Sequence, residues 1–142
     1  MGKLAVIYWS GTGNTQTMAE AVLEGAQAAG ADAQLFDVSE ITPQAAAGYD
    51  RLALGCPAMG DEVLEEGAFE PFFSELEGML AGKPVALFGS YGWGDGQWMR
   101  DWQERCTAAG AQLVGGEGVM ANDAPDESAL EACRALGKAL AG

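Results

Sequence analysis

The sequence contains no histidine and only three cysteines. Without histidine, neither a Ser-His-Asp triad nor a Cys-His pair can form, and the commonest metal ligand is absent. Cys56, Cys106 and Cys133 are too few for a four-cysteine zinc site. Their odd number argues against a disulfide framework and is typical of a reducing compartment. We therefore expect no bound metal and no catalysis of these two kinds.

Basic residues are also scarce, with 7 Lys and Arg against 21 Asp and Glu, which gives a formal net charge of −14. Such a surface repels nucleic acid and anionic membranes, and it attracts partners with a basic face. The apolar run Leu4–Trp9 is too short to span a membrane and is not followed by the cleavage site of a signal peptide. We expect a cytoplasmic protein that binds neither nucleic acid nor membranes.

The length of 142 residues, with 49% apolar types, predicts one folded domain over residues 1–142. Alanine-rich segments repeatedly end at a glycine that precedes a new apolar run, as a helix, its cap and a strand do. Predicted strands cover Lys3–Trp9, Ala31–Asp37, Arg51–Gly55, Pro84–Gly89 and Gln112–Glu117. The short segment Pro43–Ala47 stays undecided. Alternating strands and helices predict an α/β fold, with an open parallel sheet covered by helices on both faces.

The loop after the first predicted strand has the composition of a phosphate site. Its residues are Ser10, Gly11, Thr12, Gly13, Asn14 and Thr15. Main-chain N–H groups, hydroxyls and a helix N-terminus together favour an anion. The loop lacks the lysine of a Walker A motif, and Gln16 stands where a dinucleotide fingerprint needs its third glycine. Simple capping of the helix by Ser10, Thr12 or Asn14 is the alternative.

The loops after the third and fourth predicted strands each combine glycines with one large apolar side chain. These side chains are Met59 and Trp93. Two apolar plates on flexible backbone suit a flat aromatic ligand between them. A ligand with one phosphate and one large planar ring, spanning three adjacent loops, is flavin mononucleotide (FMN).

Four segments of the sequence match one known family. They are Tyr8-Trp9-Ser10-Gly11-Thr12-Gly13-Asn14-Thr15, Gly55-Cys56-Pro57-Ala58-Met59-Gly60, Glu70-Pro71-Phe72-Phe73 and Leu87-Phe88-Gly89-Ser90-Tyr91-Gly92-Trp93-Gly94. Over essentially its whole length the chain resembles the short-chain flavodoxins of the clostridial type. The resemblance implies a doubly wound five-stranded sheet in the order 2-1-3-4-5 and a tight, non-covalent FMN. It also implies a monomer that is not an enzyme but a low-potential one-electron carrier between redox proteins, cycling mainly between semiquinone and hydroquinone.

The resemblance also implies roles for individual residues. Ser10, Thr12, Asn14 and Thr15 would hold the phosphate together with the loop amides at Gly11 and Gly13. Met59 would cover the inner face of the flavin ring and Trp93 its outer face, while Glu62 would accept a hydrogen bond from N3 of the ring. The Gly60–Asp61 peptide would turn its carbonyl toward N5. Gly92 and the neighbouring backbone would meet the N1/O2 edge, with Ser90 nearby. The same loops contribute Pro57, Ala58, Tyr91 and Gly94, and Asn122 is carried over from the loop after the fifth strand.

Several other residues carry simpler expectations. Trp98 and Trp102 share a helical face and are expected in the core or at its rim rather than in contact with the flavin, and Cys56 is expected to be a buried apolar residue. Trp9 either contacts the ligand or only ends its strand. An acidic group, Asp61, Glu62, Glu65, Glu66 and Glu70, would oppose full reduction of the flavin and steer basic partners, or would form a solvated helix face.

Three alternatives share parts of this pattern. An NAD(P)H-dependent FMN or quinone reductase would need a nicotinamide site, and the sequence offers no spare basic cluster for it. A phospho-acceptor receiver would need an aspartate at the end of the third strand, where Leu54, Gly55 and Cys56 stand. A flavodoxin-like partner of ribonucleotide reductase would keep FMN and electron transfer but restrict the partner.

Overall fold

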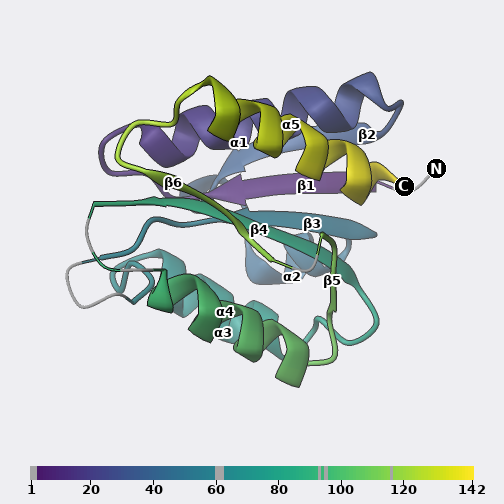
Figure 1. The fold of residues 1–142 in the computed structure, drawn as a ribbon. Helices are drawn as coiled ribbons and strands as arrows, with labels where there is room; N and C mark the ends of the chain where they lie inside the picture. Colours follow the sequence, from purple (N-terminus) through teal and green to yellow (C-terminus); the bar gives the residue numbers. More distant parts are fainter. Residues whose placement is uncertain (1–2, 60–62, 93, 95, 116) are drawn as a thin grey trace.

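The computed structural model describes residues 3–59, 63–92, 94, 96–115 and 117–142. Strands and helices alternate along the chain (Figure 1). The strands are β1 (Lys3–Tyr8), β2 (Asp32–Asp37), β3 (Arg51–Gly55), β4 (Pro84–Tyr91), β5 (Gln112–Leu113) and β6 (Val119–Asn122). The helices are α1 (Asn14–Ala28), the 3₁₀ turn η1 (Val38–Glu40), α2 (Pro43–Ala47), α3 (Phe69–Glu77), α4 (Gln97–Ala108) and α5 (Glu127–Ala141).

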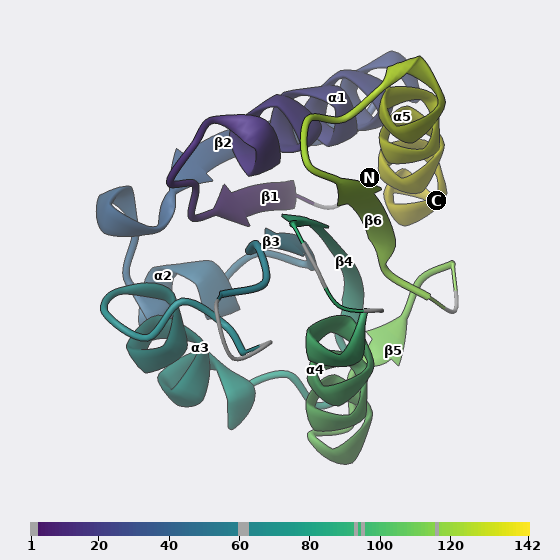
Figure 2. The same ribbon diagram turned by 60° about the vertical axis from the view of Figure 1, so that its left-hand side comes forward.

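The sheet is parallel and has the predicted order, β2-β1-β3-β4-β5. Continuous apolar residues in β1, β3 and β4 allow both faces of the sheet to be covered. Because the strands are parallel, their carboxyl ends share one edge. The view in Figure 2 brings this edge forward. In open sheets of this order, ligands bind beyond the carboxyl ends of the strands, where the strand order reverses.

The predicted fifth strand, Gln112–Glu117, is wrong in its extent. The structure has β5 over two residues only, and a separate strand β6 then runs parallel to the last residues of β4. Gly115 lies between them with a φ of +85°, a left-handed conformation that ends the extended chain. Asn122 is consequently the last residue of β6 and pairs with Tyr91, rather than lying in a following loop.

β3 has the predicted bounds, and three other strands differ from the prediction at one end by one or two residues. β1 and β2 are each one residue shorter than predicted, so Trp9 follows its strand. β4 is two residues longer, which makes Ser90 and Tyr91 strand residues rather than loop residues. The segment left undecided, Pro43–Ala47, is the short helix α2, which Thr42 caps by accepting a hydrogen bond from Ala45 N.

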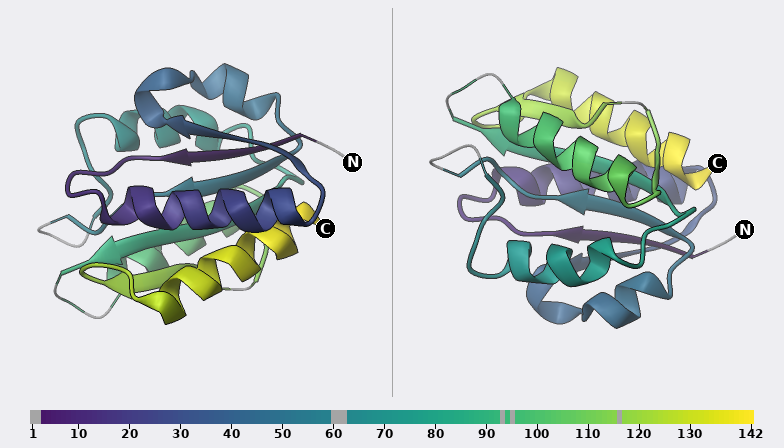
Figure 3. Two further views of the ribbon diagram at one scale, coloured as in Figure 1. Left: turned by 90° about the horizontal axis from the view of Figure 1, so that it is seen from above. Right: turned by 90° about the horizontal axis from the view of Figure 1, so that it is seen from below.

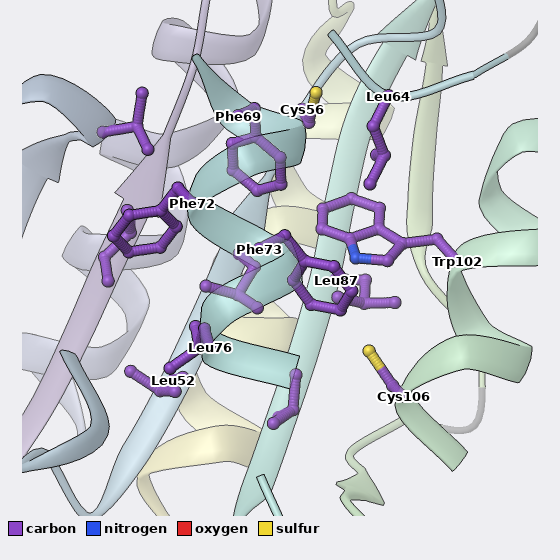
Figure 4. Close-up of a cluster of buried hydrophobic side chains, with 14 of the residues drawn as sticks. Leu52, Cys56, Leu64, Phe69, Phe72, Phe73, Leu76, Leu87, Trp102 and Cys106 are labelled. Atoms are coloured by element: carbon purple, nitrogen blue, oxygen red, sulfur yellow. The ribbon is translucent and has the colours of Figure 1, made fainter. Parts of the chain in front are cut away.

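Helices cover both faces of the sheet, as predicted. Figure 3 shows α1 and α5 side by side on one face, and α2, α3 and α4 on the other. The face under α3 and α4 holds the aromatic core, in which Figure 4 shows Trp102 beside Phe69 and Phe73. Trp98 and Trp102 are each 1% exposed, which confirms that they lie in the core. Among the described residues, no helix has the length and apolar character needed to cross a membrane.

Candidate functional site

Three chain segments far apart in the sequence line one cavity of about 250 Å³ at the carboxyl edge of the sheet. The segments follow β1, follow β3 and end β4, and one residue after β6 joins them. The lining residues are Trp9, Ser10, Gly11, Thr12, Asn14, Thr15, Pro57, Ala58, Met59, Ser90, Tyr91, Gly92 and Asp123. The cavity therefore brings together most of the residues that the sequence singled out.

The loop between β1 and α1 leaves several main-chain donors open. Gly13 is the N-cap of α1 with a φ of +96° and has no side chain to cap the helix, and the Thr12 hydroxyl accepts only a long hydrogen bond from Asn14 N, at 3.5 Å. The Ser10 hydroxyl accepts a hydrogen bond from Gly13 N at 3.0 Å, so it closes the loop instead. Among the described residues, the N–H groups of Gly11, Thr12 and Thr15 have no acceptor. Open donors beside the positive end of a helix dipole form an anion site.

Thr15 has a different role from the other loop hydroxyls. Its side chain is 1% exposed, and its Oγ1 lies 3.1 Å from Ser90 Oγ. Ser90 N also donates to Thr15 Oγ1, at 3.4 Å. The hydroxyl of Thr15 thus ties the first turn of α1 to the end of β4, beneath the cavity.

The segment after β3 continues alongside β4 before it turns away. Ala58 N donates to Ser90 O at 3.0 Å, and Met59 N donates to Val63 O at 2.9 Å. Pro57, Ala58 and Met59 are half-buried and line the cavity. Gly60, Asp61 and Glu62, which the sequence places in the same turn, lie outside the described residues.

The segment after β4 contributes Tyr91 and Gly92 to the lining. Trp93, the predicted outer plate, lies outside the described residues. Gly94 is exposed and is not among the lining residues, and neither is Gly13. Asn122 is also outside the lining, and its side-chain Nδ2 donates to Tyr91 O at 3.4 Å.

Asp123 is a lining residue that the sequence did not single out. Its φ is +56°, and its N–H donates to Tyr91 O at 2.7 Å. A Cβ added at Gly92 would lie 3.5 Å from Asp123 Oδ1, so the Asp123 carboxylate lies beside Gly92, which also lines the cavity. The dipeptide Asn122-Asp123, both of whose residues tolerate a left-handed backbone, is the sequence signal for this turn.

Trp9, whose role the sequence left open, lines the cavity. Its ring lies over Gly11, since an added Cβ there would approach Trp9 Cη2 to 3.1 Å. Glycine at position 11 therefore lets the indole pack against the loop of residues 10–15, which we call the phosphate-type loop.

The described lining contains one carboxylate, Asp123, and no lysine or arginine. Two members of the acidic group have structural partners instead. The Glu65 carboxylate accepts hydrogen bonds from Gly67, Ala68 and Phe69 N–H and so caps α3. Burial opposes the ionisation of Glu65, but these three donors outweigh it and hold its pKa below its ordinary value.

Glu70 pairs with Arg105 of α4, at 2.7 Å from Nη1. This hydrogen bond holds the pKa of the Glu70 carboxyl below its ordinary value. Cys56 is fully buried, as predicted, and burial raises the pKa of its thiol well above the ordinary value. A buried neutral thiol behaves as a small apolar side chain.

Comparisons with known proteins agree with this arrangement. The flavodoxin family model matches residues 6–137. A flavodoxin from Clostridium beijerinckii is 48% identical over 97% of this chain and 99% of its own length. A flavodoxin from Megasphaera elsdenii is 44% identical, over 96% of each chain.

The fold comparison points the same way. The solution structure of two-electron reduced Megasphaera elsdenii flavodoxin has a TM-score of 0.88 and 43% identity, and the match covers 97% of this chain and 98% of that chain. The strand order, the loops that meet at one cavity and the full-length similarity together show that the chain belongs to the flavodoxin family.

Proposed function

We propose that FMN binds in the 250 Å³ cavity, with its phosphate at the loop of residues 10–15 and its ring between the segments after β3 and β4. As a flavodoxin, the protein is an FMN-dependent electron carrier between redox proteins and not an enzyme. Bound FMN supplies the chemistry, which is the uptake and release of single electrons. The observation that carries the proposal is the open, uncharged donor set at the start of α1.

The described lining fits this cofactor at both ends. An anion that carries no metal suits the donors at the start of α1. These are the unpaired N–H groups of Gly11, Thr12 and Thr15, the hydroxyls of Ser10 and Thr12, and the side-chain amide of Asn14. The apolar parts of Met59, Ala58 and Tyr91 suit a planar ring. The proposal keeps the roles that the resemblance implies for four further residues. Trp93 would cover the outer face of the ring, Glu62 would accept a hydrogen bond from N3, and the Gly60–Asp61 peptide would face N5.

The chain's own contribution is to hold the ring and restrict water around it. The segment at Pro57–Met59 is bonded to β4 through Ala58 N, and the segment at Tyr91 is bonded to Asp123 N. These two segments, between which the ring is proposed to bind, form the two walls of the ring site, and hydrogen bonds hold both of them in place. The phosphate charge stays uncompensated because no cation faces it in the described lining, and an uncompensated negative charge disfavours further reduction of the cofactor.

The binding proposal is tested by adding FMN or riboflavin to the cofactor-free protein and following flavin fluorescence. We expect one FMN per chain, with quenched fluorescence. Riboflavin, which lacks the phosphate, should bind more weakly by about a hundredfold or more, since charge-assisted hydrogen bonds contribute about 1.5–3 kcal/mol each. Equal affinities would contradict the phosphate assignment, and steady oxidation of NAD(P)H by the protein alone would contradict the carrier function.

A pair of methionine variants tests the ring site. Met59→Ala removes a side chain that lines the cavity, whereas Met79→Ala removes a half-buried one near the far end of α3. We expect the first to weaken FMN binding and the second to leave it unchanged. The opposite result would place the ring elsewhere.

The same proposal extends to partners and surroundings. With a formal charge of −14, the protein should dock on basic surfaces of reductases and other oxidoreductases, and should act as a cytoplasmic monomer without membrane association. Electron transfer to a basic redox protein such as cytochrome c should slow as ionic strength rises. A rate that rises with salt would contradict a basic docking surface, and sedimentation at about twice 14.7 kDa would contradict the monomer.

A further inference from the structure

Trp98 of α4 does not line the cavity, but it contacts two residues beside the proposed site of the flavin ring. One of them, Cys56, precedes the segment after β3, and the other, Tyr91, ends β4. The Trp98 Nε1–H donates to the carbonyl of Cys56 at 3.1 Å, in a buried position. Cys56 immediately precedes Pro57, Ala58 and Met59, which line the cavity. The Trp98 ring also packs on the ring of Tyr91, with centroids 5.6 Å apart and an interplanar angle of 45°.

The packing at this point depends on a residue without a side chain. An added Cβ at Gly89 would lie 2.2 Å from Cys56 O and 3.2 Å from Trp98 Cζ2. Neither the carbonyl nor the indole could keep its place against such a group. Gly89 therefore allows β4, the Cys56 carbonyl and the indole to meet.

Few other hydrogen bonds hold the segment after β3 in its position beside β4. Cys56 N donates to Phe88 O at 3.2 Å, and Ala58 N donates to Ser90 O at 3.0 Å. The Cys56 thiol accepts a weak hydrogen bond from Glu65 N at 3.3 Å. Among the described residues, Trp98 is the one donor to the carbonyl of Cys56.

We infer that Trp98 is a positioning residue for the flavin: through the Cys56 carbonyl and the Tyr91 ring, it sets the spacing of the two segments between which the isoalloxazine binds. This inference rests on the proposed FMN site and deepens it. The hydrogen bond to the Cys56 carbonyl links the segment after β3 to helix α4, and the ring contact with Tyr91 links the end of β4 to the same helix.

Trp102 provides a matched control on the same helix. It lies one turn further along α4 and is, like Trp98, 1% exposed. Its Nε1–H has no hydrogen-bond acceptor among the described residues. Its ring meets Phe69 and Phe73 nearly edge-on, with centroids 5.5 and 5.9 Å away, deep under α3 (Figure 4). A tryptophan-to-phenylalanine change there removes the same atoms without touching either wall of the cavity.

The experiment compares Trp98→Phe with Trp102→Phe in the full-length protein. Three quantities are measured: the dissociation constant of FMN, the midpoint potentials of the bound flavin, and the hydrogen-exchange rate of Ala58 N–H in the cofactor-free protein. Phenylalanine keeps most of the ring but leaves the Cys56 carbonyl without its donor. We expect Trp98→Phe to raise the dissociation constant about tenfold, to shift the potentials and to speed Ala58 exchange. Trp102→Phe should change the dissociation constant less than about twofold and leave the potentials in place.

The outcomes separate this inference from the proposed function. If wild-type protein does not bind FMN, the proposed function fails. If wild-type protein binds FMN but the two variants affect affinity and potentials equally, Trp98 has only a structural role and the inference is overturned. If Trp98→Phe does not fold, Gly89→Ala is measured instead, because its Cβ pushes apart the Cys56 carbonyl and the Trp98 indole without removing the indole N–H. In that case unchanged potentials of the folded Gly89→Ala protein overturn the inference.

Discussion

The hydroxyls of Thr15 and Ser90 lie 3.1 Å apart in a buried contact between residues 75 positions apart in the sequence. Thr15 is in the first turn of α1 and Ser90 is near the end of β4. The contact therefore joins the phosphate-type loop to the strand that carries one wall of the ring site. It also explains why a residue of this loop can be almost fully buried.

We expect Thr15→Val to lower the free energy of unfolding by about 1–3 kcal/mol, because it leaves buried groups of Ser90 without their partner. Ser90→Ala should be destabilising too, and the double variant should cost less than the sum of the single changes. Urea unfolding of the cofactor-free protein gives these values. Thr17→Val, at an exposed hydroxyl of the same helix, serves as the control and should cost under about 1 kcal/mol. Strict additivity of the Thr15 and Ser90 effects would show that the two hydroxyls are not coupled.

Gly13 is required for its backbone rather than for space. A Cβ would meet nothing within 4 Å at Gly13 or at Gly78, but Gly13 has a φ of +96° whereas Gly78, the C-cap of α3, has a φ of −73°. We expect Gly13→Ala to destabilise the protein by about 1–2 kcal/mol and to weaken FMN binding. Gly78→Ala should be neutral or stabilising by about 0.5 kcal/mol. Similar effects at both positions would argue against a backbone cause.

Glu65 should make stability depend on pH in the acid range. Its folded pKa is lowered from the ordinary value of 4.5, so its contribution is complete above that value and is lost as the pH falls through the folded pKa. We expect Glu65→Gln to cost about 1 kcal/mol at neutral pH, as the loss of a helix cap does. The difference from wild type should shrink at lower pH. Glu66→Gln, at an exposed neighbour, is the control. A difference that stays constant with pH would mean that the charge of Glu65 plays no part.

Asp123 should influence the redox potential of the bound cofactor. It is the one carboxylate in the described lining, and Asn tolerates the same left-handed backbone. At about 10 Å and an effective dielectric of about 20, removal of one charge is worth roughly 1 kcal/mol after screening. This corresponds to about 40 mV for one electron. We expect Asp123→Asn to raise the potential of the second electron step by about this amount. Asp32→Asn, an equal charge change at the start of β2, should leave it unchanged. Equal shifts for both variants would indicate a general effect of net charge.

The parallel α/β class and the composition of the loop at residues 10–15 were both predictable from the residues, because each depends on local sequence. The order of the strands came only from the resemblance to the flavodoxins. Unbroken apolar runs and glycine caps mark the strands and their junctions, and Ser10 to Thr15 carry their donors within six consecutive residues. The fifth strand was mispredicted because two strands share one sheet edge. Val119 to Asn122 have too few residues for a periodic signal, and they extend only because the end of β4 offers them hydrogen bonds.

The local sequence thus determined the parallel sheet, the burial of the tryptophans and the donors of the phosphate-type loop. The signals for these features, which are apolar periodicity, glycine caps and adjacent donors, each act over a few residues. Only the tertiary structure decided that Asp123 borders the cavity, that Thr15 bonds to Ser90 and that Trp98 reaches the carbonyl of Cys56. Each of these contacts joins separate elements, and its geometry exists only after the helices have packed against the sheet.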